Sequence, residues 1–281
     1  MEATQSKVSG EFNWKTPETI RASLLEGDNA QAIHEEISQT YKGNPLVIGN
    51  VNYNKKSGLI EGSHPRYVVA VNGVFRKHNL PVRTASPADL GRIVESNILN
   101  SLRGTYEDSA LVLRSEENPK RYLAQHLAKQ LKARNIDFSP ENPAMIYLGD
   151  LDLVADTTTG LAFKLRDDAQ VINVPQLAKD CRFIIVNKDG VPIPDEKGNR
   201  HLYTINSGLS RLDQGGDLDL GSGWDYLGPS NAYGRVVVVS EADAKKFLAS
   251  REEELRRVYE SQIDEFAIRY ERAQRVLQGK E

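Results

Sequence analysis

The sequence has very little cysteine and no surplus of positive charge, and each absence excludes a class of protein. Cys181 is the single cysteine among 281 residues, which excludes an internal disulfide framework and a zinc site built from several thiolates. The 36 Lys and Arg residues stand against 39 Asp and Glu residues, for a formal net charge of -3. Because nucleic-acid binders use excess positive charge to neutralise phosphates, this balance disfavours DNA or RNA as a partner.

Long apolar runs are also missing. No segment approaches the roughly 18–20 uncharged apolar residues that a membrane-spanning helix needs. A typical apolar run is Val236 to Val239, the length of a short strand. The start Met1-Glu2-Ala3 is polar and acidic, unlike the basic and then apolar start of a signal peptide. We therefore expect a protein of the cytoplasm that has no membrane partner.

The familiar catalytic motifs are missing as well. The sequence holds no Gly-x-Ser-x-Gly nucleophile elbow, no phosphate-binding P-loop, no dinucleotide fingerprint and no His-Glu-x-x-His zinc motif. Its five histidines are scattered without the spacing of metal ligands. The sequence alone therefore leaves open whether the protein is an enzyme.

The composition is that of a folded chain, with 39% hydrophobic and 27% charged residues. Residues 1–15 are small and polar and predict a flexible arm. Residues 16–140 alternate between helix and strand signals, and residues 141–239 contain short strands with many Gly and Asp; the two regions are compatible with one domain, 16–239. Residues 240–278 predict a helix. The expected fold class is α+β, with an N-terminal mixed helix and strand region, a β-rich Gly/Asp-rich region and a long C-terminal amphipathic helix.

Within the mixed region, two segments rich in Val and Ile, 45–53 and 67–75, lack helical spacing and predict strands. Ser86 and Asp89 predict a helix start, because the Ser hydroxyl can accept the Asp backbone amide. A further helix is expected to open at Asn118-Pro119. Its buried face is predicted by a stripe of leucines at helical spacing, Leu123, Leu127 and Leu131.

A β-hairpin is predicted from the strands 147–155 and 161–166, joined by the loop 156–160. Opposite charges then face each other across the two strands, in the pairs Asp152–Lys164 and Asp150–Arg166. Such pairs contribute about 0.2–1 kcal/mol each. Ion pairing therefore explains this first Gly-Asp-Leu-Asp-Leu copy better than a metal site does.

The second Gly-Asp-Leu-Asp-Leu copy, 216–220, lies in a loop rich in Asp and Gly that spans 213–225. Clustered carboxylates repel one another unless solvent or a cation separates them. The loop predicts a Ca²⁺ or Mg²⁺ site formed by Asp213, Asp217 and Asp219, and a solvated loop without metal is the favoured alternative. The spacing is not that of an EF-hand, because the twelfth position counted from Asp213 is Trp224.

Three aromatic residues belong to the same stretch of chain, Trp224, Tyr226 and Tyr233. Aromatic side chains on a polar, Gly-rich loop predict a recognition surface for a peptide, a sugar or a base. The alternative, which we favour at this level, is that these rings pack the loop onto the β-rich core.

The last segment has the most regular pattern. Ser240-Glu241-Ala242-Asp243 predicts a capping box, and no Gly or Pro follows until Gly279. A helix over this segment would be about 57 Å long. Its apolar stripe follows an eleven-residue repeat, which keeps the stripe nearly straight. The stripe residues expected to bind a partner are Leu248, Leu255, Tyr259, Phe266, Tyr270 and Leu277.

These patterns lead to three hypotheses of function. The leading one is a non-enzymatic interaction or assembly protein whose last helix forms a coiled coil with a second copy or docks a protein partner, because its stripe needs more cover than one small domain provides. The alternative is a metal-dependent enzyme or ligand-binding protein with a cation in the loop 213–225. A third and weaker hypothesis is nucleic-acid binding through a basic patch, formed by Arg114, Lys120, Arg121, Lys129, Lys132 and Arg134.

Overall fold

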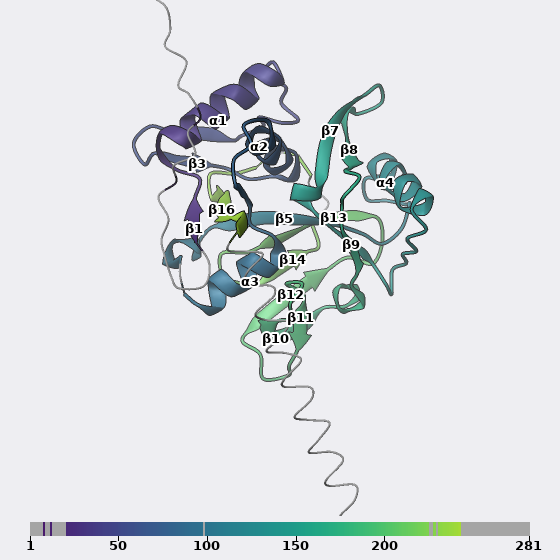
Figure 1. The fold of residues 1–281 in the computed structure, drawn as a ribbon. Helices are drawn as coiled ribbons and strands as arrows, with labels where there is room; N and C mark the ends of the chain where they lie inside the picture. The colour runs from purple at the N-terminus through teal and green to yellow at the C-terminus, as the bar shows by residue number, and fades with distance from the viewer. Residues whose placement is uncertain are drawn as a thin grey trace, which may run out of the picture.

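The described residues of the computed structural model are 8, 12, 21–97, 99–224, 227–228 and 230–242. This part of the chain forms four α-helices and sixteen strands, and Figure 1 shows the helices arranged around a large central sheet. No helix in this part is long and apolar enough to cross a bilayer.

Nine strands form the central sheet. They are β5 (Tyr106–Leu113), β6 (Ala144–Tyr147), β9 (Val171–Asn173), β10 (Cys181–Val186), β11 (Pro192–Pro194), β12 (Arg200–Thr204), β13 (Leu209–Gln214), β14 (Leu220–Ser222) and β15 (Gly234–Arg235). Their order is β11-β10-β12-β14-β13-β5-β6-β9, and β15 pairs with β5. The β12–β14 and β15–β5 pairs are parallel, and the other neighbours are antiparallel.

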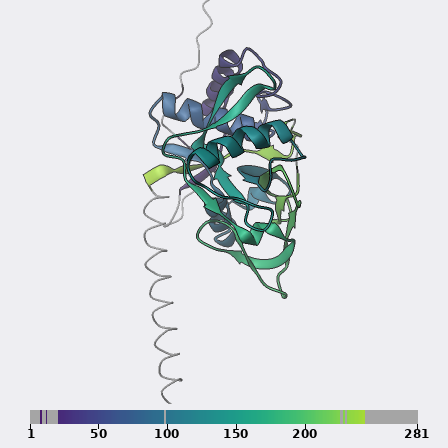
Figure 2. The ribbon, with the colours of Figure 1, turned by 90° about the vertical axis from the view of Figure 1, so that its right-hand side faces the viewer.

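The helices of the described chain lie on and beside this sheet. They are α1 (Gly27–Thr40), α2 (Pro65–Lys77), α3 (Pro87–Glu95) and α4 (Arg121–Ala133). Short 3-10 turns occur at η1 (Asn100–Leu102), η2 (Leu148–Asp150) and η3 (Pro175–Ala178). α2 contacts α1 and β5, and α4 contacts β5 and β13. Figure 2 looks onto α4, which lies across the strands.

β5 is buried on both faces, because successive side chains of a strand point in opposite directions. Leu111 and Leu113 belong to the large core that also contains the buried faces of α1, α2 and α4. Ala110 and Val112 belong to a second core on the other face, together with Phe183 of β10. The strand therefore links the two halves of the interior.

Smaller sheets complete the fold. A three-stranded sheet has the order β1-β16-β4, built from β1 (Ala22–Leu24), β4 (Val82–Thr84) and β16 (Val237–Ser240). Two hairpins are also present, β2–β3 and β7–β8, built from β2 (Asn52–Asn54), β3 (Leu59–Glu61), β7 (Leu151–Asp156) and β8 (Gly160–Leu165). The β7–β8 hairpin contacts α2 and α4. The β1–β16 pairing joins the two ends of the described chain.

The expected fold class, α+β with an N-terminal mixed helix and strand region, a β-rich Gly/Asp-rich region and a long C-terminal helix, is wrong. The fold is mixed α/β and consists mostly of sheet, and its central strand pair combines the two regions. β5 from the first region pairs with β13 from the second, with Leu113 opposite Leu209. The local patterns identify strands one by one but do not specify which distant strands pair, because pairing depends on packing against neighbours.

A long C-terminal helix is not seen among the described residues, which end at Ala242. Ser240, the expected helix cap, is the last residue of β16. The predicted partner-binding residues Leu248, Leu255, Tyr259, Phe266, Tyr270 and Leu277 all lie outside the described residues and have no part in the site below.

The segment 67–75 is helix rather than strand, because it lies within α2. His64 caps this helix by accepting the backbone amide of Tyr67, and Pro65 occupies its first position. Most of the thirteen residues of α2 are buried. The β-branched valines of this segment favour a strand locally, and their burial in the large core as part of a helix overrides that preference.

The β7–β8 hairpin has the predicted register, with Asp152 opposite Lys164. The ion pairs differ from the prediction. Asp152 Oδ1 lies 2.6 Å from Nη2 of Arg76 on α2, and Arg166 pairs with Asp168. Asp152 therefore pairs with an arginine of another element, although Lys164 lies directly opposite it in the hairpin.

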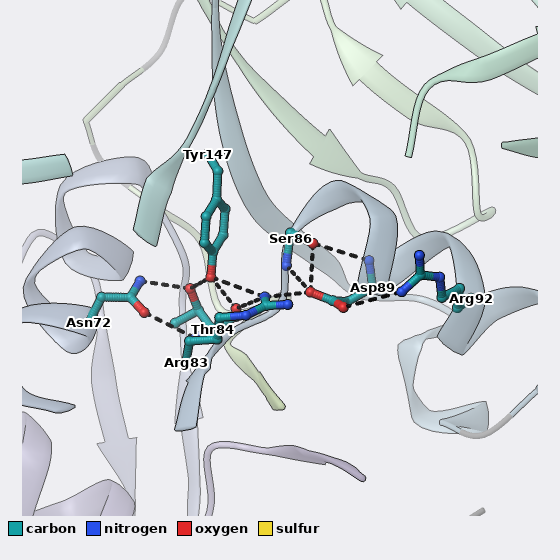
Figure 3. Close-up of polar contacts among 7 residues, drawn as sticks. All are labelled: Asn72, Arg83, Thr84, Ser86, Asp89, Arg92 and Tyr147. Atoms are coloured by element: carbon teal, nitrogen blue, oxygen red, sulfur yellow. Dashed lines mark hydrogen bonds and ion pairs between the residues drawn. The ribbon is translucent and has the colours of Figure 1, made fainter. Parts of the chain in front are cut away.

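The start of α3 carries the predicted capping box and a buried ion pair (Figure 3). The Asp89 carboxylate accepts hydrogen bonds from the Ser86 amide and hydroxyl, and its Oδ2 lies 2.5 Å from Nη1 of Arg83. Beside this pair, Asn72 of α2 donates to the Thr84 hydroxyl, and the Tyr147 hydroxyl donates to the Thr84 carbonyl. The network thus connects α2, β4, α3 and β6.

Asp89→Ala is expected to cost roughly 3 kcal/mol of unfolding free energy, because it removes the cap and leaves the Arg83 charge without its carboxylate. Burial by itself would raise the pKa of Asp89, but the Arg83 charge and the hydrogen bonds hold it below its ordinary value. Urea unfolding measures the loss. Asp168→Ala, which removes an exposed ion pair, should cost about 0–1 kcal/mol, and equal losses in both variants would contradict the assignment.

Candidate functional site

The residues of the predicted cation site lie in and after β13, and each described one has a protein partner or an exposed position. Asp213 is buried, with Oδ1 3.2 Å from Nε of Arg211. Asp219 accepts the backbone amide of His201. Asp217 lies in the turn between β13 and β14. Within the described ranges, no group of three or more His, Cys, Asp or Glu side chains is arranged to hold a metal ion.

The predicted aromatic surface is described only in part. Trp224 and Tyr233 are 55% and 66% exposed, and Tyr226 lies outside the described residues. The Trp224 carbonyl accepts the backbone amide of Arg211. These two rings are therefore exposed rather than packed on the core, and what they recognise stays a prediction.

The centre of the sheet holds a buried acidic cluster. Asp108 of β5 lies opposite Asp213 of β13, and Nη1 of Arg211 lies 3.4 Å from Oδ1 of Asp108. The neighbouring Glu107 is 2% exposed and accepts the Thr105 hydroxyl. Burial raises the pKa of Asp108, that of Asp213 to about 7 and that of Glu107 to about 8. Because these carboxyls are closed to solvent, the cluster is a structural feature of the sheet rather than a substrate site.

An open cleft of about 440 Å³ lies between the first turns of α2 and α4. This volume is in the range of small-molecule sites, roughly 300–1,000 Å³. α2 contributes Arg66, and α4 and the residues before it contribute Asn118, Lys120, Arg121, Tyr122 and Leu123. The remaining walls are Leu46, Thr159, Leu227 and Gly228. The described lining thus combines three cationic side chains with apolar walls and includes no acidic side chain.

Arg66 is the unusual residue of this cleft. It is only 5% exposed, yet among the described residues it makes no ion pair with a carboxylate. Its Nη1 donates to the Leu227 carbonyl at 2.9 Å, its guanidinium carbon lies 5.4 Å from the Phe163 ring centroid, and its Nε has no hydrogen-bond partner. Burial lowers the pKa of Arg66, and no carboxylate among the described residues offsets this effect.

Arg114 shows how a buried arginine without a carboxylate is satisfied elsewhere in the same protein. Its guanidinium donates to the Ser210 hydroxyl, the Leu177 carbonyl and the Ser222 hydroxyl at 2.8–2.9 Å. It is completely buried and joins three strands and a turn. Arg66 makes one such bond and lines an open cleft. Its Nε is closed to solvent, so a ligand would meet the outer Nη end of the guanidinium.

The first turn of α4 lines the same cleft, from Lys120 to Leu123. Lys120, the residue before the helix, has φ 60°, and its side chain does not cap the helix. Helix N-termini attract anions, because their backbone amides lack partners and the peptide dipoles add. The approach to the helix is fixed, since the Ser207 hydroxyl donates to the Asn118 carbonyl and the Leu209 amide donates to the Pro119 carbonyl.

The hydroxyl groups of the cleft are already engaged. Tyr122 and Thr159 both donate to Asp156, at 2.6 and 2.9 Å. These hydrogen bonds lower the pKa of Asp156 to about 2, so this carboxylate stays ionised and accepts both hydroxyls. The described lining therefore offers donors and positive charge but no general base and no activated nucleophile. Its chemistry is that of anion binding.

Sequence patterns predict only part of the lining of this cleft. Lys120 and Arg121 belong to the basic patch of the third hypothesis, and the leucine stripe of α4 placed Leu123 correctly on the buried face. The predicted strand 67–75 begins one residue after Arg66, and the sequence does not mark Arg66 as a site residue. A Pro-Arg pair after a capping histidine carries no signal for ligand binding on its own.

Glu107→Gln is expected to reduce the loss of stability between about pH 4.5 and pH 8. Burial raises the pKa of Glu107 to about 8, so its neutral form stabilises the fold below its unfolded pKa, and that contribution is lost as the pH rises through 8. The difference from the parent should reach roughly 1–3 kcal/mol at high pH. Thermal unfolding from pH 5 to 9 measures it. The same change at exposed Glu196 serves as the control, and parallel pH curves for Glu107→Gln and the parent would refute the assignment.

Comparisons with known proteins place no constraint on this site. No family model, curated protein sequence or solved structure matches this chain. The candidate site therefore stands on the geometry of the cleft, above all on Arg66.

Proposed function

We propose that this protein binds a small organic anion in the cleft between α2 and α4, and that it is a ligand-binding protein rather than an acid–base catalyst. The single observation that carries the proposal is Arg66, which is buried, lines an open cleft and has no carboxylate partner among the described residues. The absence of a general base from the described lining supports binding over catalysis.

The energetics favour an anionic ligand. A buried charge without a partner costs several kcal/mol, which is why buried charges in proteins are paired. A carboxylate or phosphate in the cleft would supply the missing charge and could accept a charge-assisted hydrogen bond from the outer end of the Arg66 guanidinium. Lys120 and Arg121 at the rim are exposed and add attraction for the approaching anion.

The anion proposal is independent of the hypotheses derived from the sequence. The interaction role of the last segment, including a coiled coil and self-association, rests on residues outside the described chain. The Ca²⁺ or Mg²⁺ site of Asp213, Asp217 and Asp219, the role of the exposed aromatics and the cytoplasmic location stay predictions. The anion proposal needs none of them.

Inorganic phosphate is expected to raise the melting temperature relative to chloride at the same ionic strength. At about ten times the Kd the gain is about 1.4 kcal/mol, or roughly 3–5 °C for a chain of this size. Arg66→Gln should remove most of this rise, because it deletes the buried charge. Its own stability without phosphate should stay near that of the parent, since the variant also removes an uncompensated buried cation.

The control is Arg103→Gln, which changes an exposed arginine outside the cleft and should keep the full phosphate effect. A double variant of the exposed rim, Lys120→Gln with Arg121→Gln, tests the site without touching the core and should weaken the effect. Equal phosphate shifts in the parent, Arg66→Gln and the rim variant would overturn the proposal, and so would the lack of any shift in the parent.

A further inference from the structure

The anion-binding cleft continues into a second groove. This groove has a volume of about 510 Å³ and shares Asn118 and Arg121 with the cleft. Its other lining residues are Glu116, Glu117, Gln125 and Ser207. Arg121 and Gln125 lie four residues apart on α4, so the groove follows one face of the helix for about one turn.

The two ends of this continuous surface carry opposite charge. The cleft end holds Arg66 and Lys120, the groove end holds Glu116 and Glu117, and Arg121 lines both parts. Glu116 is paired with Lys132 of α4. Glu117 is exposed, and its carboxylate makes no ion pair with any described residue. A ligand that spans both parts would place an anion at one end and a cation at the other.

The walls beside the anion site are apolar. Leu123 and Leu227 are almost completely buried, and Leu46 is half-buried, yet all three line the cleft next to Arg66. An anionic group that carries an aliphatic side chain on the adjacent carbon would cover these walls. A bare phosphate or a polar sugar phosphate would leave them in contact with water.

We propose that the occupant is the free C-terminal end of a peptide or protein, with an apolar last residue and a Lys or Arg one or two residues before it. This inference rests on the proposed function, because the terminal carboxylate is the anion that Arg66 and the first turn of α4 receive. Capture of a C-terminal carboxylate by clustered backbone amides is a recurrent mode of peptide recognition.

The dimensions agree with this occupant. The rise along α4 from Arg121 to Gln125 is about 6 Å, and an extended peptide advances about 3.3 Å per residue. A basic side chain one or two residues before the terminus therefore reaches the groove that contains Glu117. The apolar last side chain lies against Leu46, Leu123 and Leu227.

The test uses the full chain and four probes, followed by fluorescence anisotropy or calorimetry. The probes are acetyl-Ala-Lys-Ala-Leu with a free carboxylate, the same peptide with a C-terminal amide, its Lys-to-Gln analogue, and inorganic phosphate. The free acid should bind at least about tenfold more tightly than the amide, since a charge-assisted hydrogen bond contributes about 1.5–3 kcal/mol. Arg66→Gln should reduce the free acid to the level of the amide.

The groove has its own readout. Replacing the peptide lysine by Gln should weaken binding to the parent protein by about two- to fivefold, the usual effect of an exposed ion pair. In Glu117→Gln the two peptides should bind equally, because the groove no longer offers the carboxylate. Glu196→Gln, an exposed glutamate far along the chain, should retain the difference between the peptides.

The outcomes separate this inference from the proposed function. If phosphate stabilises the protein through Arg66 but the free-acid and amide peptides bind equally or not at all, the peptide terminus is wrong and the anion site stands. If neither phosphate nor the free acid acts through Arg66, both proposals fail. If the free acid is preferred but Glu117→Gln retains the lysine effect, the placement of the basic residue is wrong.

Discussion

The antiparallel pairing of β5 with β13 is the interaction on which the rest of the structure depends. It joins the two halves of the chain, separates two cores, and fixes the position of both helices that border the cleft. Tyr106 at one end of β5 donates to the Ser63 carbonyl just before α2, and Arg114 just after the other end leads into the loop that opens α4.

In a sheet that is buried on both faces, charged side chains cannot be solvated by water and need partners within the protein. The protein satisfies its buried charges in three ways. Arg83 and Asp89 form a close ion pair that also caps a helix. Arg211 lies between Asp108 and Asp213. Burial raises the pKa of both carboxyls in spite of the Arg211 charge, and the Asp108 charge raises that of Asp213 further. Arg114 relies on neutral acceptors alone. Arg200 is also buried without an ion pair to any described residue, donates to the Leu218 carbonyl and the Gln214 amide oxygen, and lies over the Phe183 ring. Arg66 differs from it in donating to a single described acceptor, the Leu227 carbonyl, and in lining an open cleft.

The neighbourhood of Arg66 is arranged so that its charge persists without a second cation beside it. His64, two residues earlier, is completely buried. Burial, together with the nearby Arg66 charge, lowers the pKa of His64 to about 3, so the imidazole stays neutral and can accept the Tyr67 amide. The start of α2 therefore carries one positive charge, placed at the cleft, and a neutral cap behind it.

How far the sequence predicts this structure depends on whether the information is local. The β7–β8 register, the capping box at Ser86 and the leucine stripe of α4 follow from patterns within about fifteen residues, and all three are confirmed. The pairing of β5 with β13 joins residues about a hundred positions apart. α2 forms because burial in the core overrides the strand preference of its valines. The choice of Arg76 over Lys164 by Asp152 also depends on a distant element. The cleft belongs to this second class, since Arg66, Leu46 and Leu227 meet only in the folded chain.

Burial of an unpaired arginine destabilises the folded protein, and a bound anion would offset this loss of stability. The Arg66 guanidinium is held by the Leu227 carbonyl and lies over the Phe163 ring, so its side chain is ordered before any ligand arrives. A ligand then loses little of its binding energy to ordering the protein, which is the advantage of a preorganised site. The loop before α4 is fixed by hydrogen bonds from Ser207 and Leu209, so the helix amides are equally in place. The proposed anion site therefore combines an unpaired, ordered cation at Arg66 with a fixed helix start at α4. Both features favour the binding of an anion without further ordering of the protein.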